Sequence, residues 1–329
     1  MKRALITGIA GQDGSYMAEL LLAGGYQVFG LVQPGSDEHY IPEGAKIVYG
    51  DLTDVQSIKT LITESMPDEV YNFAGITDLK TAFADPVRTM KINYESVETL
   101  IKETMQANSK ARFLQASSSE IFLPSPDPLA EDSPRDWETE NPYARAKMIA
   151  DRDFVAFARE RGGRFACSAI LFNHESPRRP EASVLRKITS MLVAIARGKE
   201  ERLRIGNVTM KRDWGFAPDY VRAMWSMLQM DAPTDLVVAT GETHSVQDAI
   251  TIAAELLGMS LSWQGGGVNT CAYDSAGKKV VAVDPNFYKP AEQYPKVGDT
   301  HKIQELTGWS PKTSFTSLIK TMVDSALSS

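Results

Sequence analysis

The sequence predicts an α/β protein in which a doubly wound parallel sheet is followed by a smaller C-terminal lobe. Over the first 175 residues, short apolar runs typical of strands alternate with segments of helical periodicity. This alternation predicts parallel strands, because each pair must be joined by a crossover that is usually a helix. After about residue 175 the alternation stops. We therefore expect one domain over residues 1–175 and a second lobe over residues 176–329.

The individual elements follow from the same patterns. Strands are expected over residues 4–7, 27–32, 46–49, 69–73, 112–116 and 166–171, and helices over 15–23, 55–64, 87–107 and 142–161. The first helix should stop at Gly24 and Gly25. A further strand over 236–239 is expected to return to the first sheet, whereas helices and loops, with a polar, glycine-rich stretch over 258–290, form the C-terminal lobe.

Composition narrows the class of protein. The net charge of −7 argues against nucleic acid and anionic membranes as partners. Cys167 and Cys271 stand far apart without CxxC or Cys/His clustering, which argues against a disulfide framework and against a metal site. Neither a signal peptide nor an apolar run of about 18 residues is visible. These features predict a soluble cytoplasmic protein.

A glycine-rich turn joins the first strand to the first helix. Gly8, Gly11 and Gly14 are spaced GxxGxxG there, with Gln12 and Asp13 between the last two. Glycines permit a tight turn, and the following helix N-terminus offers N–H donors and partial positive charge to a diphosphate. The turn therefore predicts a Rossmann-type dinucleotide site in residues 1–175 and leaves the second lobe mainly for substrate.

Other strand ends extend this predicted cofactor site. Asp51 could bind an adenine edge while Leu52 packs on the ring, although Asp51 or Thr53 could instead only cap the next helix. Ala74 and Gly75 follow the fourth strand, where a dinucleotide could pass close to the backbone. The second strand ends at Gln33, with neither the acid that binds ribose hydroxyls nor the arginine that binds a 2′-phosphate.

A tyrosine and a lysine near the start of one helix predict redox chemistry. Asn141 can cap that helix and Pro142 can occupy its first position, which puts Tyr143 and Lys147 on one face. A nearby ammonium favours the phenolate, so we expect a pKa below the usual value of about 10. Lys147 can also hold the nicotinamide ribose.

Serines and a glutamate follow the fifth strand. Ser117, Ser118 and Ser119 precede Glu120 at the carboxyl edge of the predicted sheet, where open α/β folds place substrate. Serine hydroxyls could bind a sugar, and a partly desolvated Glu120 could act as acid or base. The alternative is an ordinary polar loop between strand and helix.

These motifs resemble the GDP-mannose 4,6-dehydratase family of the extended short-chain dehydrogenases/reductases. The resemblance extends over essentially the whole chain. The residues that carry it are Ala4–Gly8, Gly11–Tyr16, Tyr49–Asp54, Pro67–Asn72, Leu171–Arg179, Arg212–Gly215, Val283–Pro285 and Lys289–Glu292. The run from Asn173 to Arg179, NHESPRR, is far more specific to the family than the glycine turn.

The resemblance implies conversion of a GDP-sugar to its 4-keto-6-deoxy derivative plus water, with an internally recycled NADP, or NAD as the alternative. It implies that Tyr143, Lys147, Glu120 and Ser118 are catalytic, and that His174 and Arg179 join the cofactor site. Substrate residues implied are Asn173, Val184, Lys187, Arg212 and Lys289. It also implies a homodimer or homotetramer paired through the long helices over 87–107 and 142–161.

The chain departs from the family pattern around these pockets. The family has paired arginines that serve the NADP phosphate and a tetramer contact, where this chain has Gln33–Pro34. Ser118 stands in place of the family's threonine, and Ile121–Leu123 in place of its Leu-Tyr-Gly. Lys289 replaces an arginine and lacks its bidentate fork. A paralogue acting on another GDP-hexose or GDP-heptose fits these changes. Alternatives of the same fold are a GDP-4-keto-6-deoxymannose reductase or epimerase, and a non-catalytic dinucleotide sensor.

Overall fold

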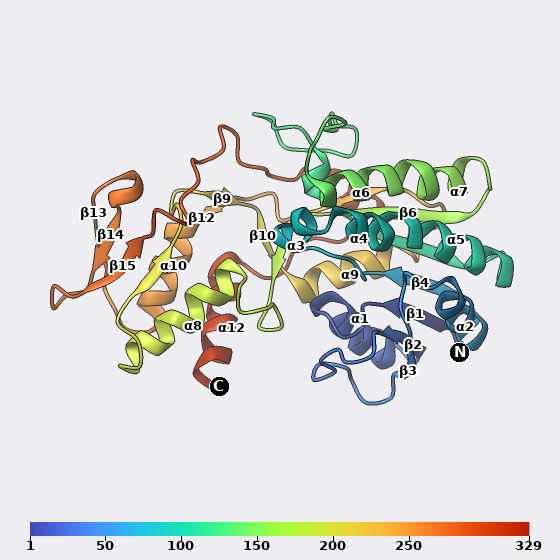
Figure 1. Ribbon diagram of the computed structural model, residues 1–329, viewed down its shortest axis with the longest axis horizontal. Helices are drawn as coiled ribbons and strands as arrows, with labels where there is room; N and C mark the ends of the chain where they lie inside the picture. The colour runs from blue at the N-terminus through green and yellow to red at the C-terminus, as the bar shows by residue number, and fades with distance from the viewer. Residues whose placement is uncertain (329) are drawn as a thin grey trace.

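A seven-stranded parallel sheet forms the larger of two lobes in the computed structural model, which describes residues 1–328 (Figure 1). The strand order is β11-β6-β5-β4-β1-β2-β3. The strands are β1 Arg3–Thr7, β2 Gln27–Val32, β3 Lys46–Tyr49, β4 Glu69–Asn72, β5 Arg112–Ser118, β6 Phe165–Leu171 and β11 Leu236–Val238. The order reverses between β1 and β4, which makes the sheet doubly wound and confirms the predicted fold class.

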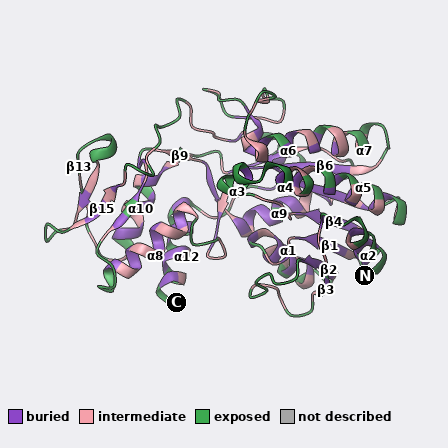
Figure 2. Cartoon of the chain, in the orientation of Figure 1, coloured by how far each residue is buried: buried purple, intermediate pink, exposed green. Residues whose placement is uncertain are grey.

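Helices cover both faces of this sheet because alternate strand residues point in opposite directions. Ala4 and Ile6 of β1 face a core that includes α1 Gln12–Ala23 and α9 Ala217–Met227. Leu5 faces a second core with α2 Val55–Ser65 and α5 Ser96–Ala107. Figure 2 shows the central strands as the most continuously buried part of this lobe. α11 His301–Thr307 also lies on this lobe, beside β11.

Each of the two long helices expected from periodicity contains a π-helical segment. The first comprises α4 Pro86–Met90, η1 Lys91–Glu95 and α5, and is preceded by α3 Leu79–Ala84. The second comprises α6 Pro142–Ala150, η3 Asp151–Ala156 and α7 Phe157–Glu160. Periodicity predicted the extents but not the π segments, which are frequent at functional sites. Both segments carry a buried polar residue, Asn93 and Asp151.

The smaller lobe combines three helices with a second sheet. α8 Val184–Ala196, α10 Val246–Leu256 and α12 Phe315–Ser328 share a core with a sheet of order β13-β14-β15-β8. These strands are β13 Ser262–Gln264, β14 Cys271–Tyr273, β15 Lys279–Val283 and β8 Leu203–Ile205, and η4 Gly267–Asn269 lies between β13 and β14. The expectation of only helices and loops here was wrong. Three of the four strands have only three residues, too few to show a period of two, and the five-residue β15 falls within the stretch taken as polar loop.

Two small strand pairs lie among the segments that connect the lobes. β7 Asn173–Glu175 pairs in parallel with β10 Trp214–Phe216, and β9 Lys211–Arg212 pairs antiparallel with β12 His244–Ser245. β11, which pairs with β6, shows that the chain returns to the first sheet after contributing to the second lobe. Among residues 1–328, no helix is both long and apolar enough to traverse a lipid bilayer.

The turn from β1 into α1 is packed so tightly that it requires glycine. Gly8 has a φ of 70°, and a Cβ there would lie 2.8 Å from the amide nitrogen of Ala74. A Cβ on Gly14 would lie 2.2 Å from the carbonyl oxygen of Gly8. The helix therefore begins in direct contact with the turn, and its N-terminus lies beside the ends of β1 and β4.

We expect Gly14→Ala to destabilise the protein by about 1–3 kcal/mol, because the added methyl group collides with backbone that cannot move aside. Thermal unfolding of the purified variant measures this change. Gly266→Ala is the matched control, since a Cβ at Gly266 meets no atom within 4 Å. Equal melting temperatures for the two variants would contradict the packing argument.

Candidate active site

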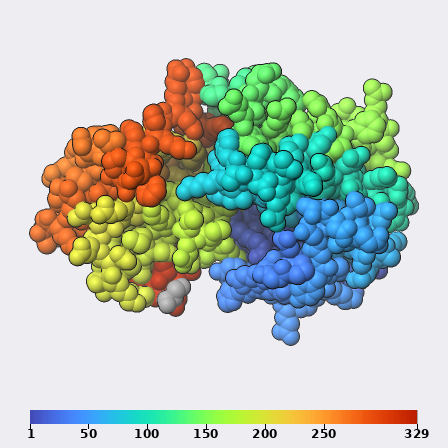
Figure 3. Space-filling view, viewed as in Figure 1, coloured from blue at the N-terminus to red at the C-terminus, as the bar shows by residue number. Residues whose placement is uncertain are grey.

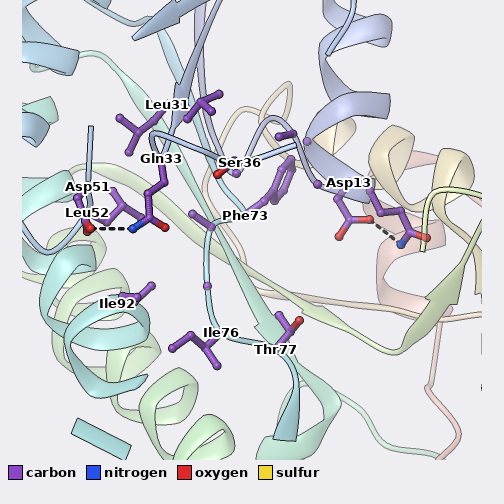
Figure 4. A pocket seen from close by; sticks show the side chains of 18 of the residues that line it. Asp13, Leu31, Gln33, Ser36, Asp51, Leu52, Phe73, Ile76, Thr77 and Ile92 are labelled. Atoms are coloured by element: carbon purple, nitrogen blue, oxygen red, sulfur yellow. Dashed lines mark hydrogen bonds between the residues drawn. The ribbon is translucent and has the colours of Figure 1, made fainter. Parts of the chain in front are cut away.

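A cavity of about 460 Å³ lies at the carboxyl ends of β1 to β4, where the strand order reverses. Figure 4 shows side chains from three strand ends facing into it, among them Leu31, Asp51 and Phe73. The structure brings together here most of the residues predicted to bind a dinucleotide: Gly8, Gly11, Gln12, Asp13, Gly14, Asp51, Leu52, Ala74, Gly75 and Arg179. A dinucleotide site at a topological switch point is the general rule for open α/β sheets.

Asp51 is held on the wall of this cavity by its neighbours. Its Oδ1 accepts a hydrogen bond from the backbone N–H of Thr53 at 2.8 Å, and its Oδ2 accepts one from the Gln33 amide at 3.0 Å (Figure 4). The N-cap of α2 is instead Asp54, whose carboxylate accepts from the N–H groups of Gln56 and Ser57. The alternative that Asp51 or Thr53 caps this helix is therefore wrong.

Asp13 forms a buried ion pair with His174 at the floor of the site. The Nε2 of His174 lies 2.9 Å from Asp13 Oδ2, and its Nδ1 lies 2.8 Å from the carbonyl oxygen of Phe172. Both partners can only accept, so both ring nitrogens carry protons and His174 is an imidazolium. Burial alone would lower the pKa of His174, but the Asp13 carboxylate outweighs it and raises that pKa. The cation in turn lowers the pKa of Asp13 against the effect of burial.

A second cavity of about 220 Å³ adjoins the first and shares Asp13, Phe73, Thr77 and Arg179 with it. Its walls come from the ends of β5 and β6, the start of α6 and β7. The residues predicted to be catalytic all lie here: Ser118, Glu120, Tyr143 and Lys147. Asn173 and His174 line the same cavity. In Figure 3 the surface is hollowed between the blue N-terminal segment, the teal segment near residue 90 and the yellow-green segment of the second lobe.

The start of α6 is built as the sequence predicts. The Asn141 side chain accepts from the N–H groups of Tyr143 and Ala144, and Pro142 occupies the first turn. Lys147, one turn after Tyr143, is 2 % exposed. Its Nζ donates to the carbonyl oxygen of Ala116 at 2.8 Å and lies 6.0 Å from the centroid of the Tyr143 ring.

The expected lowering of the tyrosine pKa is wrong for the protein on its own. Burial raises the pKa of Tyr143 to about 12, and a hydrogen bond from Ser118 only partly opposes this rise. The Glu120 carboxylate raises it further. Burial also lowers the pKa of Lys147 to about 8, so the ammonium is itself disfavoured. Burial therefore favours the protonated phenol in the protein without a ligand.

A buried carboxylate lies beneath this pair. Asp151, in the π segment η3, accepts hydrogen bonds from the hydroxyls of Ser117 and Ser168, the latter at 2.6 Å. Burial raises the pKa of Asp151 to about 6 despite these two donors. Its negative charge raises the pKa of Lys147 against burial. Asp151 thus favours the charged form of Lys147 through its charge, without a direct ion pair among the described residues. Sequence reasoning missed Asp151 because the serines that bond to it and Lys147 come from three separate elements.

Glu120 is positioned by one predicted residue and one that sequence reasoning missed. Its backbone N–H donates to the Ser118 hydroxyl at 3.2 Å, at the start of the 3-10 turn η2 Ser119–Ile121. Its Oε2 accepts from the Nζ of Lys296 at 3.2 Å. Lys296 lies 176 residues further along the chain, in the loop after β15. No local motif marks it.

Asn93 is a second missed residue. It is 1 % exposed, and its side chain bonds to Ile76 twice, accepting from the backbone N–H at 2.8 Å and donating to the carbonyl oxygen at 2.9 Å. The segment after β4 that it holds contributes Gly75, Ile76 and Thr77 to the walls of the first cavity. Asn93 falls inside an expected helix, and only the π segment aims it at that loop.

The remaining predicted substrate residues lie on the second lobe and its connections. Val184 begins α8, and Lys187 on the same helix has its Nζ 4.9 Å from the ring centroid of Phe287. Arg212 makes a bidentate ion pair with Glu292, at 2.9 and 2.7 Å. The carbonyl oxygen of Lys289 accepts from Asn207 at 3.0 Å. None of these four residues lines the dinucleotide cavity or the catalytic cavity, and Arg212 is already paired with a carboxylate.

Comparison with known proteins decides the family. The sequence profile described as GDP-mannose 4,6 dehydratase matches residues 5–322. The chain belongs to this family. A GDP-mannose 4,6-dehydratase of Yersinia enterocolitica is 39% identical, over 98% of this chain and 93% of the relative. GDP-mannose 4,6 dehydratase 2 of Arabidopsis thaliana is 40% identical, over 99% of this chain and 87% of the relative. The resemblance stated from the motifs is confirmed.

Solved structures agree on the fold of this dehydratase-family chain. The structure of RMD from Pseudomonas aeruginosa complexed with NADPH superposes with a TM-score of 0.80, covers 100% of this chain and 99% of that chain, and shares 21% identity. At that identity the likeness establishes the extended Rossmann architecture and nothing finer.

We expect Asp151→Asn to lower the pH midpoint at which cofactor binding weakens. In the wild type the Lys147 ammonium is lost as the pH rises through about 8, and removing the Asp151 charge lowers that pKa further. Binding that depends on the ammonium should therefore weaken at a lower pH in the variant. Titration of the cofactor against intrinsic fluorescence, repeated across a pH series, measures the midpoint.

Asp153→Asn is the control for this experiment. Asp153 lies in the same π segment but pairs with the exposed Arg152. The pH midpoint of cofactor binding in Asp153→Asn should match that of the wild type. A midpoint that is unchanged in Asp151→Asn would show that Asp151 does not govern the charge of Lys147.

Proposed function

We propose that this chain is a hydro-lyase that converts GDP-mannose, or a related GDP-hexose or GDP-heptose, to the GDP-4-keto-6-deoxy sugar and water. The observation that carries the proposal is the meeting of Tyr143, Lys147 and Glu120 in one cavity that shares a wall with the dinucleotide cavity. A phenol, an ammonium and a carboxylate are the groups that oxidation at C4 and elimination across C5 and C6 require. Membership of the GDP-mannose 4,6-dehydratase family supports the same reaction.

A nicotinamide dinucleotide, when bound, supplies a hydride acceptor for C4 of the sugar and later returns the hydride to C6. The first cavity fits such a group, because it lies at the carboxyl ends of β1 to β4 and is lined by Gly8, Gly11 and Gly14 of the turn into α1. Lys147 would hold the nicotinamide ribose. Tyr143 would remove the proton of the 4-hydroxyl, and its high pKa in the free protein means that this base forms only when positive charge enters the site.

Glu120 would perform the elimination. A 4-ketone acidifies the proton on C5, and Glu120 would take that proton as the hydroxyl on C6 departs as water. Ser118, whose hydroxyl accepts from the Glu120 N–H, would orient the sugar hydroxyls. The Glu120 side chain is 36 % exposed, so its carboxylate is within reach of both the cavity and solvent. Because the hydride is returned, the dehydratase needs no added reductant, unlike the reductase of the same fold.

Cations of the second lobe would bind the GDP moiety. Lys187, Arg212 and Lys289 supply positive charge in a chain whose net charge is −7, and a diphosphate needs such donors. Asn173 lines the catalytic cavity, and Val184 stands at the start of the helix that carries Lys187. A bound diphosphate would compete with Glu292 for the Arg212 guanidinium.

Incubation of the pure protein with a panel of GDP-sugars tests the proposal directly. We expect mass spectrometry to show loss of water from GDP-mannose or a close relative, without consumption of added NADPH. Tyr143→Phe and Glu120→Gln should each lower kcat by about 10²–10⁴-fold while the nucleotide still binds, since each removes one acid–base group.

Matched controls are Tyr273→Phe and Glu255→Gln in the second lobe. Tyr273 stands in β14 and Glu255 is exposed on α10. Both should keep the wild-type rate. A near-normal rate in Tyr143→Phe or Glu120→Gln would remove that residue from its role, and stoichiometric use of NADPH would favour the reductase.

We also propose that the protein uses NADP but distinguishes it only weakly from NAD. Support comes from the end of β2, where Gln33 lies on the cavity wall and donates its amide to Asp51. An amide can bind either ribose hydroxyls or a phosphate, whereas an arginine there would favour the 2′-phosphate. Arg88 and Arg179 also line the cavity and can serve phosphates of either cofactor.

Gln33→Arg should tighten NADP binding about tenfold or more and leave NAD binding nearly unchanged, because only NADP has a phosphate for the new charge. Fluorescence titration of both cofactors against the wild type and the variant measures the ratio of dissociation constants. A wild-type preference for NADP above a hundredfold would contradict weak discrimination.

We further propose a homodimer or homotetramer paired through the long helices over 87–107 and 142–161. Val87 and Phe157, near the two ends of these helices, expose 67 and 62 % of their surface. Large apolar side chains left in water at both helices support burial against a second copy of the chain.

A further inference from the structure

We propose that Lys296 is a positioning residue for Glu120, which fixes one carboxylate oxygen so that the other is left for the substrate. The inference rests on the proposed role of Glu120 in dehydration. Its starting observation is the hydrogen bond of 3.2 Å from Lys296 Nζ to Glu120 Oε2. Neither the glycine turn, the tyrosine–lysine pair nor the family motifs involve this lysine.

The Lys296 side chain is enclosed. Only 14 % of it is exposed, against 36 % for its partner. A lysine ammonium is strongly hydrated, and burying it without a partner is costly. Glu120 is the only carboxylate within ion-pair distance of Lys296 in the described chain. The position of the lysine side chain therefore depends on this one carboxylate.

Hydrogen bonds tie the backbone next to Lys296 to neighbouring segments. Val297 and Asp299 bond to Leu129 on both sides: the Leu129 N–H donates to the Val297 carbonyl at 2.8 Å, and the Asp299 N–H donates to the Leu129 carbonyl at 2.9 Å. The Gly298 N–H donates to the buried Asp213 at 3.2 Å. Leu129 belongs to the loop between η2 and α6, which joins the two halves of the catalytic cavity.

Gly298 shows how closely this segment is packed. A Cβ there would lie 2.3 Å from the Cβ of Ala239 and 3.0 Å from Cγ1 of Val237. Asp213 bonds to three further donors, the N–H and hydroxyl of Thr240 and the N–H of Gly241. The segment that carries Lys296 is thus packed between β11 and the β9–β10 connection, close to Glu120.

This arrangement matters because one carboxylate must perform two transfers. In the elimination, Glu120 takes the C5 proton, the C5–H electron pair becomes the C5–C6 double bond, and the C6–O bond breaks. The departing oxygen then takes the proton from Glu120 and leaves as water, so the carboxylate is restored. An ammonium fixed on Oε2 favours that restored carboxylate and holds the other oxygen in one orientation for both transfers.

The test combines turnover with a cofactor signal. We expect Lys296→Met to lower kcat for dehydration about 10²-fold with KM nearly unchanged, and Lys296→Arg to recover most of the rate because a guanidinium can also pair with a carboxylate. Only the elimination is slowed, so the absorbance of reduced nicotinamide should accumulate after substrate is added to Lys296→Met. A residue with a merely structural role would slow every stage and leave no such signal.

Lys302→Met is the matched control. Its side chain is 44 % exposed and lies 4.0 Å from Glu131, away from the cavity. We expect wild-type kinetics from it. A wild-type rate in Lys296→Met would overturn the inference. A raised KM with unchanged kcat and no accumulated absorbance of reduced nicotinamide would also overturn it, because Lys296 would then bind substrate rather than position Glu120.

A second measurement does not depend on activity. Melting temperatures of Lys296→Met, Glu120→Gln and the double variant form a cycle that detects the ion pair without substrate. We expect the double variant to lose less stability than the sum of the single variants, and additive losses would overturn the pairing. If the wild type dehydrates no GDP-sugar while the cycle shows coupling, the proposed function fails and the Lys296–Glu120 pair stands.

Discussion

The parallel direction of the strands is the constraint on which the site depends. Because β1 to β6 all run the same way, their carboxyl ends meet on one edge of the sheet, and the reversal between β1 and β4 opens a crevice there. Gly8 and Gly14 then allow α1 to begin in contact with the turn after β1. The dinucleotide cavity and the catalytic cavity are neighbours for this reason, and they share Asp13 and Arg179 as a common wall.

Burial of charge governs the chemistry within these cavities. The Asp13–His174 pair and the Lys147–Asp151 pair each place opposite charges where water is largely excluded. Asp13 and His174 each favour the ionised form of the other, and Asp151 favours the ammonium of Lys147. Tyr143 has no such fixed cation close enough to overcome burial, so its phenol remains protonated in the free protein. In the proposed mechanism, Tyr143 would become a base only when positive charge enters with a ligand.

The second lobe contributes to the site through the segments that connect it to the first lobe rather than through its hydrophobic core. Asp213 ties the Thr240–Gly241 turn to the segment that holds Gly298, and Leu129 bonds to the same segment. Through these contacts the loop after β15 brings Lys296 to Glu120. A lobe that carries the proposed GDP-binding residues is thereby linked directly to the proposed base. The proposed substrate-binding residues and the proposed acid–base groups are therefore held in one framework.

The sequence by itself determined the strands of the sheet, the glycine turn and the Asn141–Pro142 helix start, because each leaves a pattern in residues close together in the chain. It also placed Tyr143, Lys147 and Glu120 at strand and helix ends that a parallel sheet must bring to one edge. Only the tertiary structure brought Asp151 and Lys296 to these groups, and Asn93 to the loop after β4. Asp151 and Asn93 are aimed by π segments that leave no periodic signal, and Lys296 lies 176 residues from Glu120. The pKa of Tyr143 was likewise decided by burial, a property of the packed molecule that residue spacing does not contain.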